Sequence, residues 1–285
     1  MSHLSRTITV APVAGALGAE IGGVDLSTGL GEGVLEEIRS AWLEHQVVFF
    51  RDQHLDADAY LHFARAIGEP TEYPFVPGLE GHPEIIAVTK LPHETVNFGG
   101  IWHSDTAYLD VPPKATMLLG REVPPAGGDT LYASQYAAFE ALSPAMQALL
   151  EPLRAVNTSA MADVSKTRED RIRDAACPTE DAGADREYEA THPVVRTHPE
   201  TGRKALYVNI AHTARFDGMT EEESRPLLEF LFRHQVRPEF TCRFRWQVGS
   251  LALWDNRCVQ HNPVNDYHGH RRVMHRITLH GDVPR

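Results

Sequence analysis

His103 and Asp105 are the first residues in the chain whose types and spacing could hold a metal ion. In an extended segment, side chains two positions apart project to the same side, so an imidazole nitrogen and a carboxylate could meet at one point. A third ligand would complete the face of two histidines and one carboxylate that leaves positions open on a non-haem Fe(II) ion. The tripeptide alone is weak evidence, because the chain has 16 histidines and His-x-Asp also occurs as a surface or hydrogen-bonding pair.

A second group of polar residues stands near the C-terminus. An apolar run over residues 251–254 leads into a polar turn and then His261, and the stretch 271–278 follows. In a strand, Arg272 and Arg276 would share one face, with alpha carbons about 13 Å apart. Two arginines are costly to bury unless they meet anions, which a guanidinium holds with a planar fork of donors. The pattern favours a pocket for two anionic groups, although a solvent-exposed strand face would also produce it.

Short strands and a few helices must position these residues. Apolar side chains at helical spacing predict helices over residues 33–45 and after Asp56, and two more over 135–150, broken at Ser143–Pro144. Thr220 with Glu223 is a capping-box signature and predicts a helix to His234. Predicted strands are Thr7–Val10, Ala19–Ile21, Val47–Phe50, Ile85–Thr89, Ala115–Leu119, Val194–Thr197, Leu206–Val208, Thr241–Trp246, Leu251–Trp254 and Val273–His280. This pattern favours a mainly β fold with α (α+β), a sandwich or jelly roll with helical cover.

The polar segment at about 161–191 shows little periodicity. It suits either a solvated surface insert or a lid over a pocket, since long loops in compact domains are often functional. We expect a single domain over residues 1–285 that carries this segment as a lid or insert.

Composition excludes several classes of protein. The formal charge of -12 gives no long-range attraction to nucleic acid or anionic lipid, although a pocket can be locally basic. Three cysteines without a CxxC spacing argue against a disulfide scaffold or a zinc ribbon and suit a reducing compartment. The sequence shows neither the apolar run of a signal peptide nor one long enough to span a membrane. We expect a cytoplasmic protein with no nucleic-acid or membrane partner.

Taken together and in order, these motifs resemble the taurine dioxygenase/TfdA-like family of Fe(II)/2-oxoglutarate-dependent dioxygenases over nearly the whole chain. The matching stretches are 18–26 (GAEIGGVDL), 45–51 (HQVVFFR), 102–105 (WHSD), 127–130 (GGDT), 192–199 (HPVVRTHP), 254–257 (WDNR), and His261 with Arg272 and Arg276.

The resemblance implies a double-stranded β-helix, the cupin-like jelly-roll core of this superfamily. It implies His103, Asp105 and His261 as the iron ligands and catalytic centre. It also implies that Thr130 and Arg272 hold the distal carboxylate of 2-oxoglutarate, and that Arg276 meets the anionic group of the primary substrate. The implied reaction uses O2 to hydroxylate a substrate C–H bond while 2-oxoglutarate is decarboxylated to succinate and CO2.

Taurine itself fits the sequence poorly. Where taurine-specific relatives carry a histidine, a tyrosine and an asparagine, this chain aligns Tyr73, Val76 and Gly99, and His212 replaces an aromatic residue. A site that lacks polar partners for an amine should reject it strongly. With Tyr108 as a further pocket wall, we expect an organic anion with a larger apolar body, such as an aryloxyalkanoate, alkyl sulfate or alkyl sulfonate.

Rival functions remain open on the sequence. Taurine dioxygenase proper is one, and a zinc hydrolase using the same histidines and aspartate is another. A non-catalytic jelly-roll binding protein is a third, although it would predict damage to the triad. The resemblance further suggests a homo-oligomer, either a dimer or a tetramer.

Overall fold

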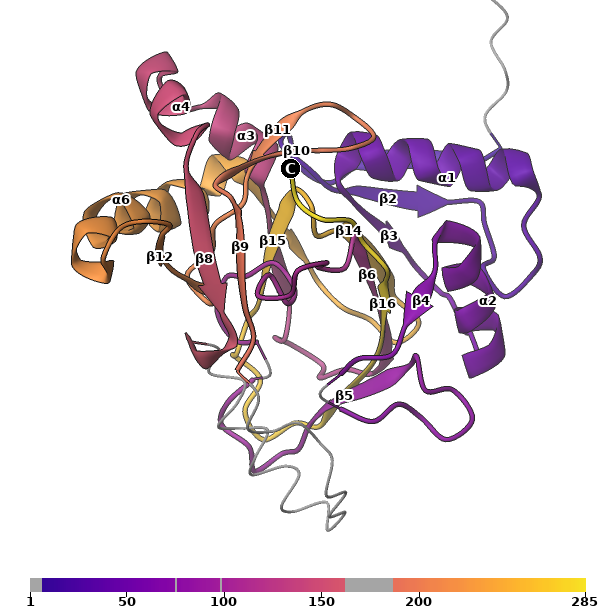
Figure 1. The fold of residues 1–285 in the computed structure, drawn as a ribbon. Coiled ribbons are helices and arrows are strands. Elements are labelled where there is room, and N and C mark those ends of the chain that lie inside the picture. The colour runs from indigo at the N-terminus through magenta and orange to yellow at the C-terminus, as the bar shows by residue number, and fades with distance from the viewer. Residues whose placement is uncertain (1–6, 75, 98, 162–186) are drawn as a thin grey trace, which may run out of the picture.

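The computed structural model describes residues 7–74, 76–97, 99–161 and 187–285. Its largest element is an eight-stranded sheet in the order β1-β2-β3-β14-β6-β16-β4, with β5 paired to β16 (Figure 1). Only β2 and β3 pair in parallel within it. The strands are β1 (Thr9–Pro12), β2 (Ala19–Gly22), β3 (Val47–Phe50), β4 (Pro70–Thr71), β5 (Ile86–Lys90), β6 (Ala115–Glu122), β14 (Leu251–Asp255) and β16 (Arg272–Leu279).

A smaller sheet packs against one face of the large one. In it, β7 (Thr130–Ser134) pairs with β13 (Thr241–Phe244) on one side and β15 (Val259–Pro263) on the other. Phe49 of β3 stacks on Phe244 of β13 with ring centroids 4.0 Å apart and planes 5° apart. Tyr132, Trp254 and Met274 belong to the same buried cluster. One of the apolar clusters of the core therefore lies between two facing sheets, as the predicted jelly roll requires.

The alternation of side chains along each strand explains why the central strands are apolar throughout. In β3, Val48 and Phe50 point into the cluster under the first two helices, whereas Phe49 points toward the small sheet. In β14, Leu253 points into the cluster under the helices, and Trp254 points toward the small sheet. Because successive side chains project to opposite faces, a strand covered on both sides needs a continuous apolar run.

Two helices cover the outer face of the large sheet, α1 (Glu32–His45) and α2 (Ala57–Ile67). Trp42 of α1 and Tyr60 of α2 are fully buried in the cluster that these helices share with the sheet. The side chain of Asp56 accepts a hydrogen bond from the backbone N–H of Ala59, which confirms the predicted start of α2. Among the residues described, no helix has the length and apolar character needed to cross a membrane.

A helical layer lies on the opposite side of the molecule (Figure 1). Its own apolar cluster joins the helices to a three-stranded sheet in the order β12-β8-β9 and to the hairpin β10-β11. The elements are α3 (Gln135–Glu140), α4 (Pro144–Leu150), α6 (Glu221–His234), the 3-10 helices η1 (Ser159–Met161) and η2 (Pro238–Phe240), and the strands β8 (Arg154–Thr158), β9 (Glu189–Pro193), β10 (Val195–Thr197), β11 (Lys204–Leu206) and β12 (Thr213–Phe216).

The structure confirms the predicted helices, including the break before Pro144 and the capping box of Thr220 with Glu223. Six strands were not predicted from the sequence: β4, β7, β8, β9, β12 and β15. Most of these are short and carry polar side chains, so they lack the apolar run by which strands were recognised. Of the expected lid or insert, residues 162–186 lie outside the described residues, while its ends belong to η1 and β9.

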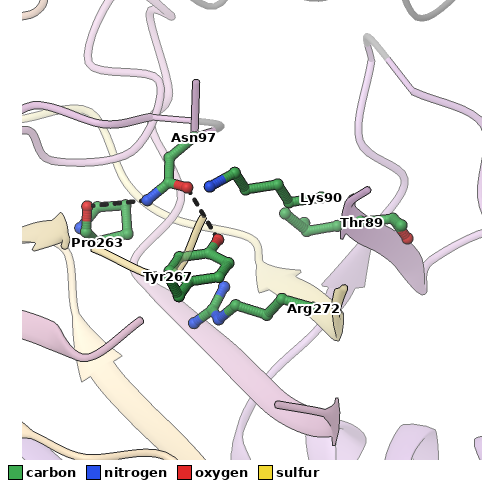
Figure 2. A pocket seen from close by; sticks show the side chains of 7 residues that line it. Thr89, Lys90, Asn97, Pro263, Tyr267 and Arg272 are labelled. Atoms are coloured by element: carbon green, nitrogen blue, oxygen red, sulfur yellow. Dashed lines mark hydrogen bonds between the residues drawn. The ribbon is translucent and has the colours of Figure 1, made fainter. Parts of the chain in front are cut away.

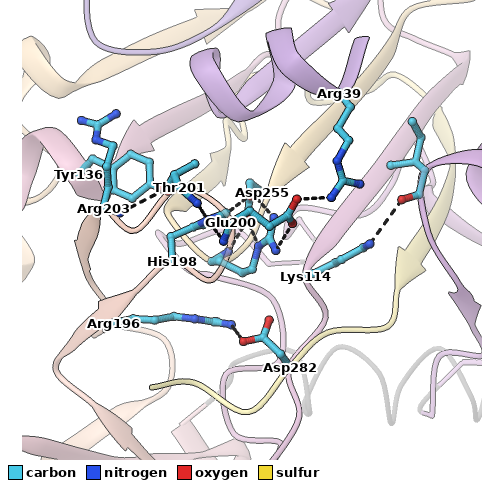
Figure 3. A network of polar contacts seen from close by, with 12 residues as sticks. Arg39, Lys114, Tyr136, Arg196, His198, Glu200, Thr201, Arg203, Asp255 and Asp282 are labelled. Atoms are coloured by element: carbon cyan, nitrogen blue, oxygen red, sulfur yellow. Dashed lines mark hydrogen bonds and ion pairs between the residues drawn. The ribbon is translucent and has the colours of Figure 1, made fainter. Parts of the chain in front are cut away.

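A buried ion network fixes the turn after β14 (Figure 3). Arg257 donates from Nε and Nη2 to the two carboxylate oxygens of Asp255 at 2.8 and 2.7 Å, and from Nη1 to Glu200 at 2.7 Å. His198 donates from Nε2 to Asp255 at 3.0 Å, and Arg39 of α1 also reaches Glu200. These contacts tie β14 to the helical cover on one side and to the β10–β11 hairpin on the other.

Candidate active site

His103 and His261 are brought together by the backbone. The N–H of His103 donates to the carbonyl of His261 at 3.1 Å, and the N–H of His261 donates to the carbonyl of His103 at 2.9 Å. The hydroxyl of Ser104 adds a hydrogen bond of 3.1 Å to the carbonyl of Val259. The segment around residue 103 is thus docked along β15, and the two imidazole centroids lie 4.2 Å apart.

Asp105 completes the group. One ligand atom from each of His103, Asp105 and His261 lies within 4.8 Å of the other two. Oδ1 of Asp105 is 3.7 Å from Nε2 of His103, while Oδ2 accepts a hydrogen bond of 2.6 Å from the hydroxyl of Thr116. The predicted convergence of two imidazoles and one carboxylate is therefore present in the fold.

The donor set is in the protonation state that a metal needs. Burial, followed by the neighbouring His103, lowers the pKa of His261 well below the ordinary histidine value, and burial also lowers the pKa of His103. Burial alone would raise the pKa of the Asp105 carboxyl, but the Arg276 guanidinium, the two imidazoles and the Thr116 hydroxyl hold it well below its usual range. At neutral pH the group offers two neutral imidazoles and a carboxylate.

Two hydrogen-bonding details fit a metal at this point. The Nδ1–H of His103 donates to the carbonyl of Ile101 at 2.7 Å, which leaves the lone pair of Nε2 available. His261 has a buried Nδ1 without a hydrogen-bond partner in the described part of the chain. A divalent ion with affinity for nitrogen and oxygen ligands, such as Fe(II) or Mn(II), suits this donor set.

Arg272 lines a pocket together with Lys90, Pro263 and Tyr267 (Figure 2). The guanidinium is buried, and its Nε and Nη2 have no hydrogen-bond partner within the described segments. Its Cζ lies 5.8 Å from the ring centroids of both Trp246 and Tyr267. Trp246 in turn donates from Nε1 to the hydroxyl of Thr130 at 3.0 Å, so Thr130 and Arg272 flank the same indole. A buried cation with unused donors requires an anionic partner.

Arg276 lies on the same buried face of β16 as Arg272, as the strand pattern predicts. Its Nη2 is 2.7 Å from Oδ1 of Asp105, and its Cζ is 5.1 Å from the ring centroid of Tyr73. Burial would lower the pKa of Arg276, but Asp105 raises it, so the guanidinium stays charged. It places a positive charge directly beside the candidate metal centre.

Several aromatic side chains lie close to His103 and to one another. The ring of His212 stands edge-on to Tyr108 at 4.9 Å and lies 6.0 Å from that of His103. Burial lowers the pKa of His212 to about 3, so this imidazole is neutral. Burial and the neighbouring Tyr73 raise the pKa of Tyr108 far above the ordinary tyrosine value. Val76 is half-buried in the segment between β4 and β5.

Gly99, one of the predicted substrate-site residues, packs directly against a candidate metal ligand. Its φ is +67°, and a Cβ built on it would lie 2.9 Å from Cε1 and 3.2 Å from Nε2 of His103. The imidazole therefore already occupies the space that a side chain at this position would need. Gly99 is required for the placement of a candidate metal ligand.

The sequence analysis missed several residues of the site. Lys90 and Tyr267 line the pocket with Arg272, and Nζ of Lys90 lies 4.0 Å above the Tyr267 ring. Thr116 and Asn256 reach the Asp105 carboxylate and backbone. Asn256 stands within the Trp-Asp-Asn-Arg motif, but the motif does not reveal which side chain points to the site.

A second buried cluster, His198, Asp255 and Cys258, also has metal-ligand composition. However, Arg257 forks onto both oxygens of Asp255, and His198 donates to the same carboxylate. These donors already satisfy the carboxylate, so the cluster belongs to the ion network that fixes the turn after β14.

The comparisons with known proteins agree with this geometry. The family described as taurine catabolism dioxygenase TauD, TfdA family matches residues 9–278. An alpha-ketoglutarate-dependent sulfate ester dioxygenase of Pseudomonas putida is 36% identical over 285 residues, covering 97% of this chain and 91% of the relative. An alpha-ketoglutarate-dependent 2,4-dichlorophenoxyacetate dioxygenase of Cupriavidus pinatubonensis is 32% identical, with 97% and 99% covered.

Solved structures give the same result for the fold. A taurine dioxygenase from Burkholderia xenovorans superposes with a TM-score of 0.81 at 36% identity, covering 98% of this chain and 92% of the other. The structure of AAD-2 in complex with Mn(II) and N-oxalylglycine superposes with a TM-score of 0.77 at 27% identity, covering 98% and 99%.

Removing a ligand tests the metal centre. We expect Asp105→Ala and His261→Ala to weaken Mn(II) binding by more than about 100-fold, since each removes a donor from a three-ligand face. Calorimetric titration of the metal-free protein with Mn(II) measures this. His275→Ala is the matched control, because this half-buried histidine follows Met274 on the other face of β16. Unchanged affinity in both ligand variants would contradict the assignment.

The packing of Gly99 on His103 gives a second prediction. Gly99→Ala should weaken Mn(II) binding by about tenfold or more, because strain of this kind costs about 1–3 kcal/mol. Gly100→Ala is the control, since a Cβ there would meet Asn97 at an ordinary 3.6 Å. Equal Mn(II) affinities for the two variants would show that the position tolerates a side chain.

Proposed function

The chain belongs to the taurine catabolism dioxygenase TauD and TfdA family, and from this premise we propose that it is an Fe(II)-dependent enzyme acting on a sulfate ester or a related organic anion. It is a 2-oxoglutarate-dependent dioxygenase. The observation that carries the proposal is the convergence of His103, Asp105 and His261 beside two buried arginines.

The proposed metal ligands are His103, Asp105 and His261. A ferrous ion bound there would supply dioxygen activation, which couples decarboxylation of 2-oxoglutarate to succinate and CO2 with hydroxylation of a substrate C–H bond. The Mn(II) and N-oxalylglycine in the structure of AAD-2 support a divalent metal beside an oxalyl ligand in this fold. The protein contributes the neutral imidazoles, the carboxylate and a buried setting that limits access of water.

We assign the distal carboxylate of 2-oxoglutarate to Arg272 and Thr130. The guanidinium has unused Nε and Nη2 donors and can fork onto a carboxylate. Thr130 Oγ1 accepts from Trp246, so its own proton is directed elsewhere and can serve the same anion. Lys90 adds a second basic side chain to the pocket wall, where its Nζ donates to Oδ1 of Asn265 at 2.8 Å and burial lowers its pKa.

The anionic group of the primary substrate would meet Arg276. This guanidinium lies beside the Asp105 carboxylate, so an anion on it places the adjoining carbon next to the metal centre. Tyr73, Tyr108 and His212 would line the apolar body of the substrate, and we keep Val76 and Gly99 as further candidates for this wall. The wall offers aromatic surface and a neutral imidazole, which suits an alkyl or aryl group better than an ammonium group.

Hydroxylation can end in cleavage. If the hydroxylated carbon carries the sulfate ester oxygen or an ether oxygen, the C–O bond to the leaving group breaks and the new hydroxyl oxygen becomes a carbonyl. An alkyl sulfate would then give an aldehyde and inorganic sulfate, and an aryloxyalkanoate would give a phenol and a keto acid or aldehyde acid. The named activity of the Pseudomonas putida relative supports the sulfate ester as the first candidate.

Three rival functions make different demands on the site. Taurine dioxygenase proper would need polar partners for an amine. A zinc hydrolase would have no use for Arg272 and Thr130, and anaerobic Fe(II) with 2-oxoglutarate gives a visible charge-transfer band that zinc does not. A non-catalytic binding protein would not need the triad. The homo-oligomer and the cytoplasmic location stay predictions.

A substrate panel tests the proposal. Succinate release should be measured with Fe(II), O2 and 2-oxoglutarate on octyl sulfate, octanesulfonate, phenoxyacetate and taurine. We expect kcat/KM on at least one bulkier anion to exceed that on taurine by about tenfold or more, because an unmet amine leaves polar groups unpaired. Brisk turnover of taurine with none of the others would instead identify a taurine dioxygenase.

Arg272 gives a separate test of the cosubstrate site. Arg272→Gln removes a charge-assisted fork worth about 1.5–3 kcal/mol, so the KM for 2-oxoglutarate should rise about 10–100-fold. The Mn(II) affinity should stay near that of the wild type, because Arg276, and not Arg272, is the arginine of β16 that pairs with Asp105. An unchanged KM for 2-oxoglutarate would remove Arg272 from the cosubstrate site.

A further inference from the structure

We propose that Thr116 and Asn256 are positioning residues that present a single oxygen of Asp105 to the metal. This inference rests on the proposed metal site and adds to it the residues that set the coordination mode. The two carboxylate oxygens of Asp105 have different surroundings: Oδ2 is held by Thr116, whereas Oδ1 faces His103 and Arg276.

A continuous chain of hydrogen bonds carries the proposal. Thr116 donates from Oγ1 to Oδ2 of Asp105 at 2.6 Å, and Asn256 donates from Nδ2 to the same Thr116 oxygen at 2.9 Å. The Oδ1 of Asn256 accepts from Nε1 of Trp254 at 2.9 Å and from the backbone N–H of Asp105 at 3.4 Å. Because Asn256 uses both ends of its amide, its orientation is fixed, and so is the direction of the Thr116 hydroxyl.

Because these residues are buried, their hydrogen bonds restrict the orientation of the Asp105 carboxylate. Thr116 is 0% exposed, Asn256 1% and Asp105 3%, so water does not compete for the hydrogen bonds. Thr116 lies on β6 between β14 and β16, opposite Trp254 and Thr278, which leaves it little freedom to move. The hydroxyl therefore restrains the rotation of the Asp105 carboxylate.

The turn that carries Asn256 is itself anchored from its other side. The backbone N–H of Asn256 donates to the carbonyl of Lys114 at 2.9 Å. The residues on either side of Asn256, Asp255 and Arg257, are hydrogen-bonded to each other. Asp255 also accepts from His198, and Arg257 donates to Glu200, within the ion network (Figure 3). The network thus supports the amide that orients Thr116 and, through it, the carboxylate.

The coordination mode matters for the chemistry of the site. A carboxylate free to rotate can bind a metal through both oxygens, which fills a position that cosubstrate or dioxygen needs. With Oδ2 held by Thr116, Oδ1 is the oxygen turned toward His103, and it would be shared between the metal and Arg276, which lies 2.7 Å away. Because Thr116 already restrains the Asp105 side chain, Asp105 loses less conformational entropy when the metal binds.

The test compares Thr116→Val with Thr116→Ser in the metal-free full-length protein, using Co(II) as the probe. Thr116→Val removes the hydroxyl at nearly constant volume, and Thr116→Ser keeps it. We expect Thr116→Val to weaken Co(II) binding by about 10–100-fold and to change the visible d–d absorption band of the bound ion. Thr116→Ser should retain both the affinity and the band of the wild type.

Two further variants separate the possible failures. If Thr116→Val does not fold, as judged by circular dichroism, Thr116→Ala removes the same hydroxyl without adding a methyl group. A folded hydroxyl-free variant with wild-type Co(II) affinity and absorption would overturn the positioning role. If Asp105→Ala also leaves Co(II) binding unchanged, the metal site itself fails and the inference with it.

Discussion

The candidate metal centre depends on one backbone contact, the reciprocal pair of hydrogen bonds between His103 and His261. These residues are far apart in sequence: His261 lies in β15, which pairs regularly with β7, whereas His103 is attached to it by an isolated bridge. The pair docks the segment of residue 103 onto β15 and orients both side chains toward the interior of the sandwich. Asp105 lies two residues after His103, so the same backbone contact also positions its carboxylate.

The charge close to the candidate metal centre differs in sign from the net charge of the chain. The chain is acidic overall, with a formal charge of -12, yet Arg276 is buried beside Asp105, and Arg272 and Lys90 are buried around one pocket. The low dielectric of the interior strengthens their attraction for anions. One carboxylate, Asp105, balances Arg276, and the unused donors of Arg272 are left for a ligand. A net negative charge on the whole chain is therefore compatible with positive charge inside a pocket.

Much of this could be predicted from the sequence, and the remainder has identifiable causes. The period of two along β16 correctly placed Arg272 and Arg276 on one buried face, and Asp56 and Thr220 correctly marked helix starts. Strand β15 was missed, since its residues Gln260, His261 and Asn262 resemble a polar turn. Their contacts are with partners distant in sequence, for example the carbonyl of Val208, which accepts a hydrogen bond from Nε2 of Gln260. Lys90, Thr116 and Asn256 were missed for the same reason: their importance lies in tertiary contacts that spacing does not record.

The close packing of Gly99 on the His103 ring links specificity to metal binding. In an open pocket, one substitution at this position could add a polar contact for a new substrate. Here the added atoms would displace a ligand, so the loop backbone around residue 99 would have to change first. Adaptation toward amine substrates is therefore epistatic: a beneficial side chain at this position becomes accessible only after other mutations have reshaped the loop.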